Sequence, residues 1–459
     1  MFSLSELQSR IQDRRGGLTP IQPGAALCVA FSGGLDSTVL LHAFARLAAG
    51  DDDYRVRAVH VDHGLHADST LWRDHCARQA QALNVEFTSI KVDVLDRAEL
   101  GLEAAARDAR YGAFSENLRD GEFLLSAHHA DDQLETLLLA LMRGAGVIGL
   151  AAMRAMEPLA RGWLARPLLS FTRAELEEWA RAEGLQWLTD PSNDNLALDR
   201  NFMRHRVVTS LRERWPSVAR TALRSTRHLQ EAAANLEQLA ELDATDAIVE
   251  QCLSVERWTA LVPERRRNLL RYWIRRRGAR VPSTRKLAAI EHDMLAASAD
   301  RVPCMQWDGW EIRRHRGLLH CEPQRPALNA EQTLQWQTTA ALTLPAELGR
   351  LRIEPTQARG LSMDRLAETL TVRFRAGGES LQPVGDGMHR KLKKLLQSAA
   401  ILPWWRTRLP LIYCGEQLLA VGDLWIAAEF AARDGEAAFT IVWDDKPQFL
   451  SRVDDQSGR

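Results

Sequence analysis

The sequence has few cysteines and no long apolar segment. Its 459 residues include six cysteines, none in a Cys-x-x-Cys pair or close to histidine in the spacing of a zinc site. We therefore expect reduced thiols rather than a disulfide framework. The longest nearly apolar stretch, Leu134–Met142, is far shorter than the ~20 residues that a membrane-spanning helix needs. The N-terminus lacks a basic region followed by an apolar core, so we expect no secretory signal and a cytoplasmic protein.

Net charge is also nearly absent. The chain has 59 Lys+Arg against 60 Asp+Glu, and 46% of its residues are apolar, which is typical of a globular protein with about three domains. The basic residues are nevertheless concentrated in three stretches, at residues 200–228, 264–286 and 373–408. Such stretches are either solvated helix faces or surfaces that bind nucleic acid. The third stretch also contains Trp404 and Trp405.

Strand and helix patterns alternate in the first part of the chain. Short apolar runs predict strands at 27–31, 55–61, 85–92 and 123–127, and helical spacing predicts helices at 37–47, 70–83, 103–118 and 131–143. This alternation predicts an α/β domain with a doubly wound parallel sheet and helices on both of its faces.

The remaining sequence changes character twice. Helical periodicity continues to about residue 320, and short alternating runs follow a proline-containing segment. We expect an α/β domain at 1–215, a mainly helical domain at 216–321, a linker at 322–344, a small α+β domain at 345–445 and a tail at 446–459.

A glycine-rich turn, Ser32–Thr38, lies between the first predicted strand and helix. Glycines let the backbone approach a ligand closely, and the N–H groups at a helix start can bind phosphate together with Ser/Thr hydroxyls. The Gly-Lys-Ser/Thr ending of a Walker A loop is absent, which allows chemistry at a phosphate other than the terminal one. The alternative is an ordinary turn in which Asp36 or Ser37 caps the helix.

A second polar cluster, His128–Glu135, follows the fourth predicted strand. In an open parallel sheet, ligands bind beyond the carboxyl ends of the strands, so this cluster and the glycine-rich turn can face one crevice. Asp132 and Glu135 share a face of a helix start and, with Asp36, could hold Mg²⁺ beside phosphates. Helix capping by Asp131 and Asp132 is the structural alternative.

Two further motifs belong to the same domain. The segment His60–Leu65 ends the second predicted strand, and Glu103, Arg107, Arg110 and Tyr111 occupy adjacent positions of a predicted helix. The two arginines could bind phosphate through paired hydrogen bonds, whereas surface ion pairing is the ordinary alternative.

The ordered set of motifs resembles the tRNA(Ile)-lysidine synthase family of PP-loop ATP pyrophosphatases. The motifs that carry this resemblance are Ser32–Ser37, His60–Leu65, Gly101–Tyr111, His128–Thr136, Arg143–Gly146, Arg166–Leu169, Asp190–Asn193, Asp199–Arg206, Val372–Glu379, Lys391–Gln397, Pro403–Arg406 and Pro410–Leu411. They extend over essentially residues 20–445. The glycine-rich turn alone fits many families, whereas the ordered set fits one.

The resemblance implies a ligase that acts on tRNA. Members of the family attach free L-lysine to carbon 2 of the wobble cytidine in the CAU anticodon of an isoleucine tRNA. They do so through an adenylated cytidine, producing lysidine, AMP and pyrophosphate, and codon reading changes from AUG to AUA. The expected partners are this tRNA and L-lysine, the expected cofactors are ATP and Mg²⁺, and a homodimer is allowed for.

The resemblance also implies a role for individual residues. ATP would contact Ser32, Gly33, Gly34, Leu35, Asp36, Ser37, Thr38, His60, Val61 and Asp62. The catalytic residues would be Asp36, Arg107, Arg110, His128, Asp132 and Glu135, with Mg²⁺ on Asp36 and Asp132. The tRNA would be bound by Arg200, Arg204, Arg206, Lys391, Lys393, Lys394 and Arg406.

Two other interpretations remain open at this point. Another PP-loop tRNA-modifying enzyme is the first, but a thiolating enzyme would need paired cysteines, and a glutamine-dependent synthetase would need a glutaminase with a nucleophilic cysteine. The second is a non-catalytic tRNA-binding protein, which would have no need of the carboxylates Asp36, Asp132 and Glu135.

Overall fold

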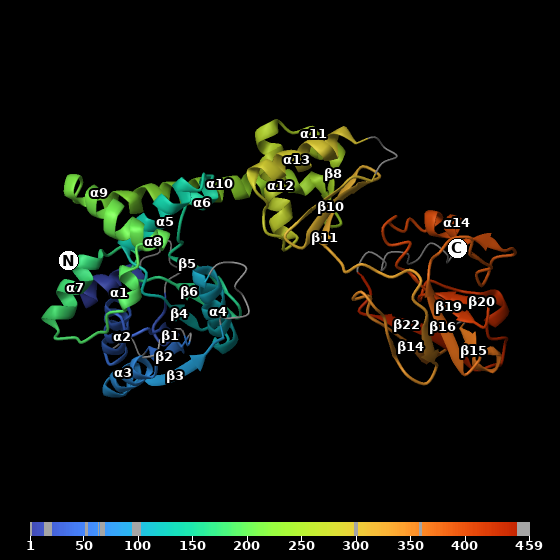
Figure 1. Ribbon diagram of the computed structural model, residues 1–459, viewed down its shortest axis with the longest axis horizontal. Coiled ribbons are helices and arrows are strands. Elements are labelled where there is room, and N and C mark those ends of the chain that lie inside the picture. Colours follow the sequence, from blue (N-terminus) through green and yellow to red (C-terminus); the bar gives the residue numbers. More distant parts are fainter. Residues whose placement is uncertain are drawn as a thin grey trace. The chain divides into compact units, whose positions relative to one another are not determined.

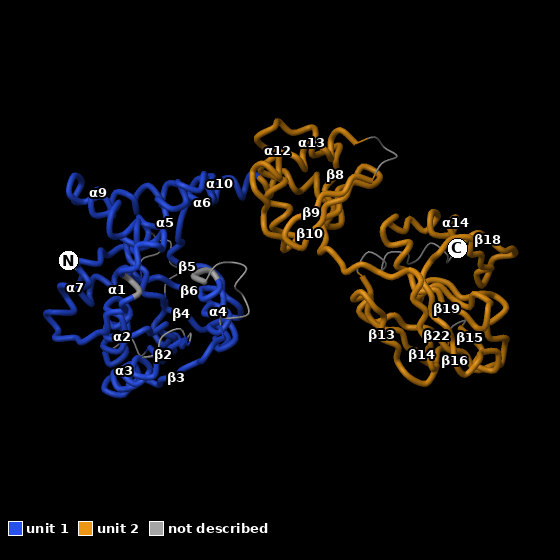
Figure 2. The backbone as a smooth tube through the Cα atoms, in the orientation of Figure 1, with its two compact units in different colours: residues 1–239 blue, residues 240–459 orange. Residues whose placement is uncertain are grey.

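The computed structural model divides the chain into two compact units, residues 1–239 and 240–459 (Figure 2). It describes residues 2–12, 21–50, 54–62, 64, 69–93, 102–297, 302–357 and 360–447. Outside the description lie His63, Leu65, Gly101, the side chains of Glu103, Ser192 and Asn193, and residues 448–459 of the expected tail. The four domain boundaries expected from the sequence remain predictions.

The first unit is built on a six-stranded sheet with the order β3-β2-β1-β4-β6-β5 (Figure 1). Its strands are β1 (Ala26–Ala30), β2 (Arg55–Asp62), β3 (Glu86–Lys91), β4 (Phe123–Leu125), β5 (Met156–Leu159) and β6 (Gly162–Ala165). All neighbouring strands are parallel except β5, which runs antiparallel to β6. The predicted α/β fold with a parallel sheet is therefore confirmed.

Helices cover both faces of this sheet. The crossover helices are α2 (Leu35–Ala48), α3 (Ser69–Ala82), α4 (Leu102–Asn117) and α5 (Ala130–Met142), and α1 (Leu4–Gln12), α6 (Val147–Leu150) and α7 (Arg173–Ala182) complete the set. Leu27 and Val29 of β1 pack with Phe44 of α2 in one apolar cluster. The other face buries Cys28 with Phe114 of α4. Alternate β1 residues thus enter two cores, as the side-chain period of a strand requires.

The strand order reverses direction between β1 and β4. The chain proceeds from β1 to β2 and β3 on one side, then crosses to β4 on the other side of β1. Ligands bind at such a switch point in open α/β sheets, because the loops after the two strands diverge there and leave a crevice. The glycine-rich turn follows β1 and the His128–Glu135 cluster follows β4, so both lie at this point.

A nearly continuous helical region ends the first unit. It comprises η3 (Pro191–Asp194), α8 (Asp199–Phe202), the π-helical turn η4 (Met203–Val208), α9 (Thr209–Arg214) and α10 (Val218–Ala247), which crosses the unit boundary. Single π-turns inside helices frequently lie at functional sites. Here Arg200 belongs to α8 and Arg204 to η4.

The second unit begins with helices packed on an antiparallel sheet. The helices α11 (Val255–Thr259), α12 (Pro263–Arg276) and α13 (Thr284–Ala296) accompany β7 (Ile248–Val249), β8 (Cys252–Ser254), β9 (Cys304–Trp307), β10 (Trp310–His315) and β11 (Leu318–Pro323). The five strands have the order β7-β8-β11-β10-β9. The expected helices are present, and the sheet is an addition that the sequence pattern did not predict.

The last part of the second unit is rich in strands. It contains β12 (Leu334–Gln337), β13 (Leu342–Thr343), β14 (Arg350–Thr356), β15 (Leu361–Ser362), β16 (Thr369–Phe374), β17 (Ser380–Leu381), β18 (Arg390–Lys391), β19 (Pro410–Cys414), β20 (Gln417–Val421), β21 (Trp425–Ile426) and β22 (Ala438–Asp444), with α14 (Leu392–Ser398), η5 (Met363–Arg365) and η6 (Ala428–Phe430). Two sheets, β12-β16-β19-β20-β21 and β13-β14-β22-β15, enclose a core that includes Trp336, Trp405 and Trp443. This agrees with the small α+β domain expected from the sequence.

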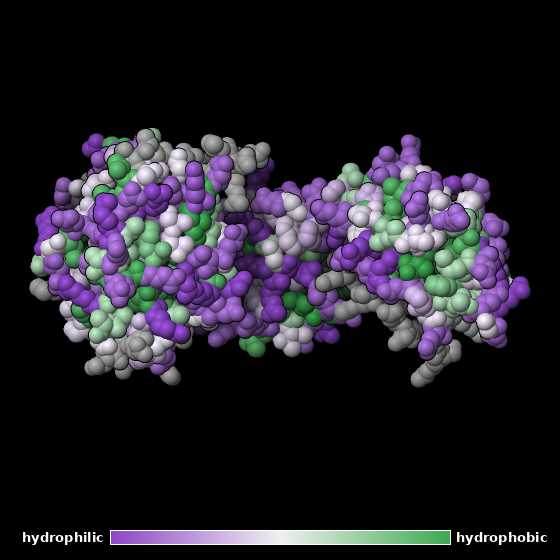
Figure 3. Space-filling view, turned by 90° about the horizontal axis from the view of Figure 1, so that it is seen from below, coloured by the Kyte–Doolittle hydropathy of each residue, from purple (hydrophilic) through white to green (hydrophobic). Residues whose placement is uncertain are grey.

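Hydrophilic side chains cover much of the face seen in Figure 3, with smaller apolar patches between them. No helix within the described residues is long and apolar enough to cross a membrane.

Candidate active site

The glycine-rich turn after β1 is organised around Ser37. The Ser37 hydroxyl donates to the Gly34 carbonyl oxygen at 3.0 Å and accepts from the Ser32 backbone N–H at 3.3 Å, with Ser32 Oγ 3.1 Å away. Gly34 is the N-cap of α2, and no described side chain caps this helix. The capping alternative is therefore not what the structure shows, and the first N–H groups of α2 are available to an anion.

Gly33 is needed in this turn for two reasons. Its φ is +80°, and a Cβ at this position would lie 2.9 Å from the sulfur of Cys76. A φ in this range strains any residue that has a side chain, and the buried Cys76 allows little room.

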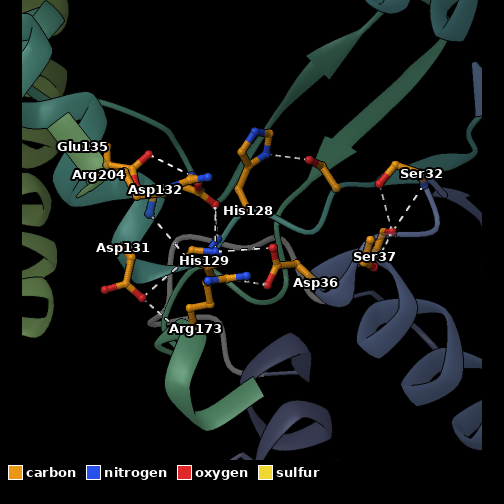
Figure 4. Close-up of polar contacts among 12 residues, drawn as sticks. Ser32, Asp36, Ser37, His128, His129, Asp131, Asp132, Glu135, Arg173 and Arg204 are labelled. Carbon is orange, nitrogen blue, oxygen red and sulfur yellow. Dashed lines mark hydrogen bonds and ion pairs between the residues drawn. The ribbon is translucent and has the colours of Figure 1, made fainter. Parts of the chain in front are cut away.

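His129 joins the two strand ends. Its Nε2 lies 3.6 Å from Asp36 Oδ2 and 3.4 Å from Asp132 Oδ2, and its Nδ1 lies 3.6 Å from Asp131 Oδ2 (Figure 4). Burial alone would lower the pKa of His129, but Asp132, Asp36 and Asp131 raise this pKa to about 9. Nδ1 also accepts a hydrogen bond from the Asp132 backbone N–H at 3.4 Å, because His129 is the N-cap of α5. Nε2 is therefore the ring nitrogen that faces Asp36 and Asp132 with a proton.

Asp132 is held by groups that stabilise its ionised form. Its Oδ2 accepts a hydrogen bond from the His129 backbone N–H at 3.0 Å, and its Oδ1 accepts from Arg204 Nη2 at 3.1 Å. Burial would raise the pKa of Asp132, but His129, His128, Arg200 and Arg204 lower it well below its usual range. Asp132 is therefore a carboxylate at all physiological pH values.

Glu135 lies behind Asp132 and does not line the cavity described below. It is 1% exposed and accepts hydrogen bonds from Arg204 Nε at 2.7 Å and Nη2 at 3.0 Å, and from Arg200 Nε at 3.3 Å. The structure therefore places Arg200 and Arg204, expected on tRNA, against the carboxylates of α5. In this geometry the Glu135 carboxylate contacts the two arginines and does not reach the cavity in which a substrate would bind.

Two neutral histidines face the space between the strand ends. His128 Nδ1 lies 2.5 Å from Ser126 Oγ, and burial, which the charges of Arg166, Arg200 and Arg110 reinforce, lowers the pKa of His128 to about 3. His60 Nδ1 donates to the Phe31 carbonyl at 2.9 Å, and burial lowers its pKa as well. Both rings are uncharged at neutral pH.

A cavity of about 700 Å³ opens beside these groups. Its lining includes the predicted residues Ser32, Gly34, Asp36, Ser37, His60, Val61, Asp62, Arg110, His128 and Asp132. An apolar wall is added by Val59, Phe114, Leu124 and Leu164, and polar groups by Tyr111, Asp190 and Asn195. A cavity of this size, with an apolar wall and a few convergent polar groups, suits a nucleotide-sized ligand.

The predicted residues that do not line this cavity are Gly33, Leu35, Thr38, Arg107 and Glu135. Leu35 and Thr38 are buried under the turn. Arg107 is exposed, with its guanidinium 5.1 Å from the centre of the Tyr111 ring. Of the two arginines of α4, the structure therefore brings Arg110 to the cavity and leaves Arg107 outside it.

One oxygen in the site lacks a hydrogen-bond donor. Asp36 Oδ1 is buried and accepts no hydrogen bond from the described residues. Within those residues, no three His, Cys, Asp or Glu side chains converge into a complete metal site. Arg173 Nε lies 4.0 Å from Asp36 Oδ1 (Figure 4), and Mg²⁺ on Asp36 and Asp132 stays a prediction.

The other residues that were expected to bind tRNA differ in their exposure to solvent. Arg206, Lys391, Lys393 and Lys394 are exposed. Arg406 is half-buried and donates from Nε to the Ile401 carbonyl at 2.8 Å, and burial with the nearby Arg316 and Arg375 lowers its pKa.

Comparison with known proteins agrees with these features along the whole chain. Residues 5–211 match the model of the PP-loop domain, residues 253–320 that of the TilS substrate binding domain, and residues 370–443 that of the TilS substrate C-terminal domain. The curated tRNA(Ile)-lysidine synthase of Coxiella burnetii is 40% identical over 92% of this chain and 94% of that protein.

Two further relatives give the same result. The tRNA(Ile)-lysidine synthase of Alkalilimnicola ehrlichii is 41% identical over 91% of this chain and 94% of that protein. The one of Methylococcus capsulatus is 39% identical over 92% of this chain and 97% of that protein. The resemblance of the motifs is thereby confirmed, and the chain belongs to the tRNA(Ile)-lysidine synthase family.

Proposed function

We propose that this protein joins free L-lysine to carbon 2 of the wobble cytidine in the CAU anticodon of an isoleucine tRNA, and that it consumes ATP and releases AMP and pyrophosphate. The product, lysidine, reads AUA instead of AUG. The observation that carries this proposal is the meeting of a phosphate-binding turn and the Asp36–His129–Asp132 cluster at one cavity, in a chain of the lysidine synthase family.

The first step makes a leaving group on the cytidine. The carbonyl oxygen at carbon 2 attacks the α-phosphate of ATP, the bond to pyrophosphate breaks, and an adenylated cytidine forms. The N–H groups at the start of α2, with Ser32 and Ser37, would bind the phosphates. Arg110 lines the same cavity, where its guanidinium would stabilise the charge that builds on the α-phosphate.

Asp36 and Asp132 are the residues that would hold Mg²⁺. The buried Asp36 Oδ1 lacks a hydrogen-bond donor among the described residues, and Mg²⁺ is commonly bound by one or two carboxylates with substrate phosphates. When bound, the ion would neutralise charge on the pyrophosphate that leaves. His129 Nε2 lies 3.6 Å from Asp36 Oδ2 and 3.4 Å from Asp132 Oδ2 and would help to position both carboxylates.

The second step consumes lysine. Its ε-ammonium, with a reference pKa of about 10.4, must lose a proton before the amine attacks carbon 2 and AMP leaves. Asp132 lines the cavity as a carboxylate that would pair with the ε-ammonium. The pKa of Asp132 lies well below its usual range and burial lowers the pKa of His128 to about 3, so neither group is assigned as the base. His128 would be an uncharged hydrogen-bonding neighbour.

The tRNA body would be bound by basic residues outside this cavity. Arg206, Lys391, Lys393 and Lys394 are exposed, and contacts of such residues with phosphates give affinity without reading sequence. Arg200, Arg204 and Arg406 already make hydrogen bonds within the protein and would contribute less. The cytoplasmic location and the homodimer remain predictions from the sequence.

Incorporation of labelled lysine into unfractionated tRNA tests the proposal. Purified protein should label an isoleucine tRNA only when ATP is present. Release of pyrophosphate on addition of tRNA without incorporation of lysine would indicate a different nucleophile, and the absence of both in the presence of Mg²⁺ would overturn the proposal.

A further inference from the structure

Trp404 lies in the third basic stretch, where a role in stacking on RNA bases would require an exposed ring. The ring is instead half-buried against the sheet that contains β10 and β11. It packs edge-on to His315 and His320, with ring centroids 6.1 and 5.2 Å apart. The Arg313 guanidinium lies 5.4 Å from the centre of the Trp404 ring.

A hydrogen bond fixes the orientation of this ring. The Trp404 indole N–H donates to Oε1 of Glu322, a residue of β11 that is 4% exposed. Burial raises the pKa of Glu322 to about 7, although Trp404, Arg313 and Arg325 oppose this rise. Burial of a carboxyl group without a hydrogen-bond donor costs free energy. Loss of the Trp404 indole would leave the Glu322 carboxyl without this hydrogen bond.

Further contacts join the same two segments. Arg408 Nη2 donates to the Pro326 carbonyl at 3.0 Å, and Arg325 lies 5.3 Å from the centre of the Trp405 ring. A cavity of about 300 Å³ lies between the segments and is lined by Glu311, Arg313, Glu322, Arg325, Trp404 and Arg408, among others. Most of these contacts are polar, and polar contacts between two parts of a chain commonly allow them to move relative to each other.

The segment between β11 and β12 does not fix this arrangement by itself. Residues 324–333 contain no helix or strand, so the contacts of Trp404, Trp405 and Arg408 must supply much of the order. The segment that they hold begins with the exposed lysines of α14. The sheet on which Trp404 docks belongs to the part that carries the basic helix α12.

We propose that Trp404 is a positioning residue for tRNA: by docking on Glu322, it holds the basic segment Lys391–Arg408 against the sheet β9–β11, so that both basic regions of the second unit bind one tRNA together. This inference rests on the proposed function. Two binding surfaces held at a fixed separation bind a common ligand more tightly than either surface alone, because the second contact becomes intramolecular.

The test compares binding of two RNAs by the full chain. Trp404→Ala should weaken binding of the full-length isoleucine tRNA by about tenfold or more. An isolated anticodon stem–loop is too short to contact both surfaces, so the affinity of the variant for it should stay within about twofold of wild type. The kcat of the variant at saturating tRNA should also stay within about twofold. The matched control is Trp163→Ala, on β6 in the first unit and 38% exposed, which should change neither affinity.

Two results would overturn the inference. One is full-length tRNA binding by Trp404→Ala within about twofold of wild type. The other is an equal loss for both RNAs together with a lower thermal midpoint, which would mark a merely structural role. If Trp404→Ala does not fold, Trp404→Phe keeps an aromatic ring but removes the indole N–H together with the five-membered ring, and its loss of full-length binding should be about threefold or more.

The result can be separated from a failure of the proposed function. If wild type fails to incorporate lysine into tRNA, the proposed function is wrong. Small-angle scattering would still decide the docking, because Trp404→Ala should increase the radius of gyration of the full chain, and an unchanged radius would contradict it.

Discussion

Arg204 bonds two carboxylates of α5 at once. Its Nε and Nη2 donate to Glu135 at 2.7 and 3.0 Å, and Nη2 also donates to Asp132 at 3.1 Å. The π-helical turn that carries Arg204 is thereby tied to the carboxylate of Asp132, which we propose to be catalytic. Asp132, which faces the cavity, and Glu135, which does not, therefore have different expected roles.

Asp132→Asn should abolish lysine transfer while tRNA binding survives. The substitution removes the charge that we assign to Mg²⁺ and to the ε-ammonium, and loss of one such electrostatic contact costs about 10²–10³ in rate. The measurement is single-turnover lysine incorporation, with a binding assay beside it. Asp120→Asn is the control, because the Asp120 side chain is 88% exposed. Near-normal transfer by Asp132→Asn would remove Asp132 from the mechanism.

Glu135→Gln should act through Arg204. Breaking a buried, hydrogen-bonded ion pair destabilises a protein by about 3 kcal/mol, so the thermal midpoint should fall. Arg204 should then lose part of its hold on Asp132, so lysine incorporation should fall together with the thermal midpoint. A variant with a normal midpoint and a total loss of activity would instead indicate that Glu135 touches a substrate.

Gly33→Ala should raise the KM for ATP strongly. Gly24 offers a matched control, because both glycines have a φ of +80°, but only at Gly33 would a Cβ meet Cys76 Sγ, at 2.9 Å. Gly24→Ala should therefore show the cost of the backbone conformation alone. Equal KM values for the two variants would show that the phosphate-binding turn tolerates the displacement.

Salt should weaken tRNA binding steeply, since counterions are released when lysine and arginine neutralise phosphates. Lys393→Ala with Lys394→Ala should flatten the plot of log affinity against log salt concentration, by about 0.7–0.9 per lost phosphate contact. Lys446→Ala is the control, because Lys446 is paired with Asp423 at 2.7 Å. A slope that is unchanged in the double variant would exclude these two lysines from the tRNA surface.

Binding of full-length tRNA should also depend on Glu322. Burial raises the pKa of Glu322 to about 7, whereas the hydrogen bond from Trp404 opposes this rise. The stability of the arrangement that buries Glu322 is therefore fully present below the ordinary pKa of a glutamate and is lost as pH rises through about 7. The groups that face this carboxyl are Trp404, Glu311, Arg313, Arg325 and Arg408. Glu322→Gln should make the affinity less dependent on pH between about 6 and 8, and an identical pH profile for both proteins would contradict this account.

The sequence predicted the parts of the fold that leave a periodic signal. Alternating strands and helices of the first unit were identified because β1 and β4 are apolar runs, β2 alternates between polar and apolar residues, and helices of ten or more residues separate the strands. The sheet at residues 248–323 was not predicted. Its strands β7 and β8 contain only two and three residues, and the six residues of β10 and of β11 do not alternate regularly between apolar and polar along their length.

The candidate site divides in the same way. The residues of the turn and of the His128–Glu135 cluster were identified from their motifs, and most of them line one cavity. The role of His129 was not predicted from the sequence, because its contact with Asp36 depends on β1 and β4 lying side by side. A run of basic residues also conceals its ion pairs: Arg265 bonds Asp243, which is 22 residues away in the sequence.

The chemical identity of the wobble nucleoside tests the proposed function most directly. Isoleucine tRNA with a CAU anticodon would be incubated with the purified protein, ATP, Mg²⁺ and L-lysine, then digested to nucleosides and analysed by mass spectrometry. The account predicts that the wobble cytidine gains a lysine and that the gain disappears without ATP or in Asp132→Asn. An unmodified cytidine, or a cytidine that carries another group, would contradict it.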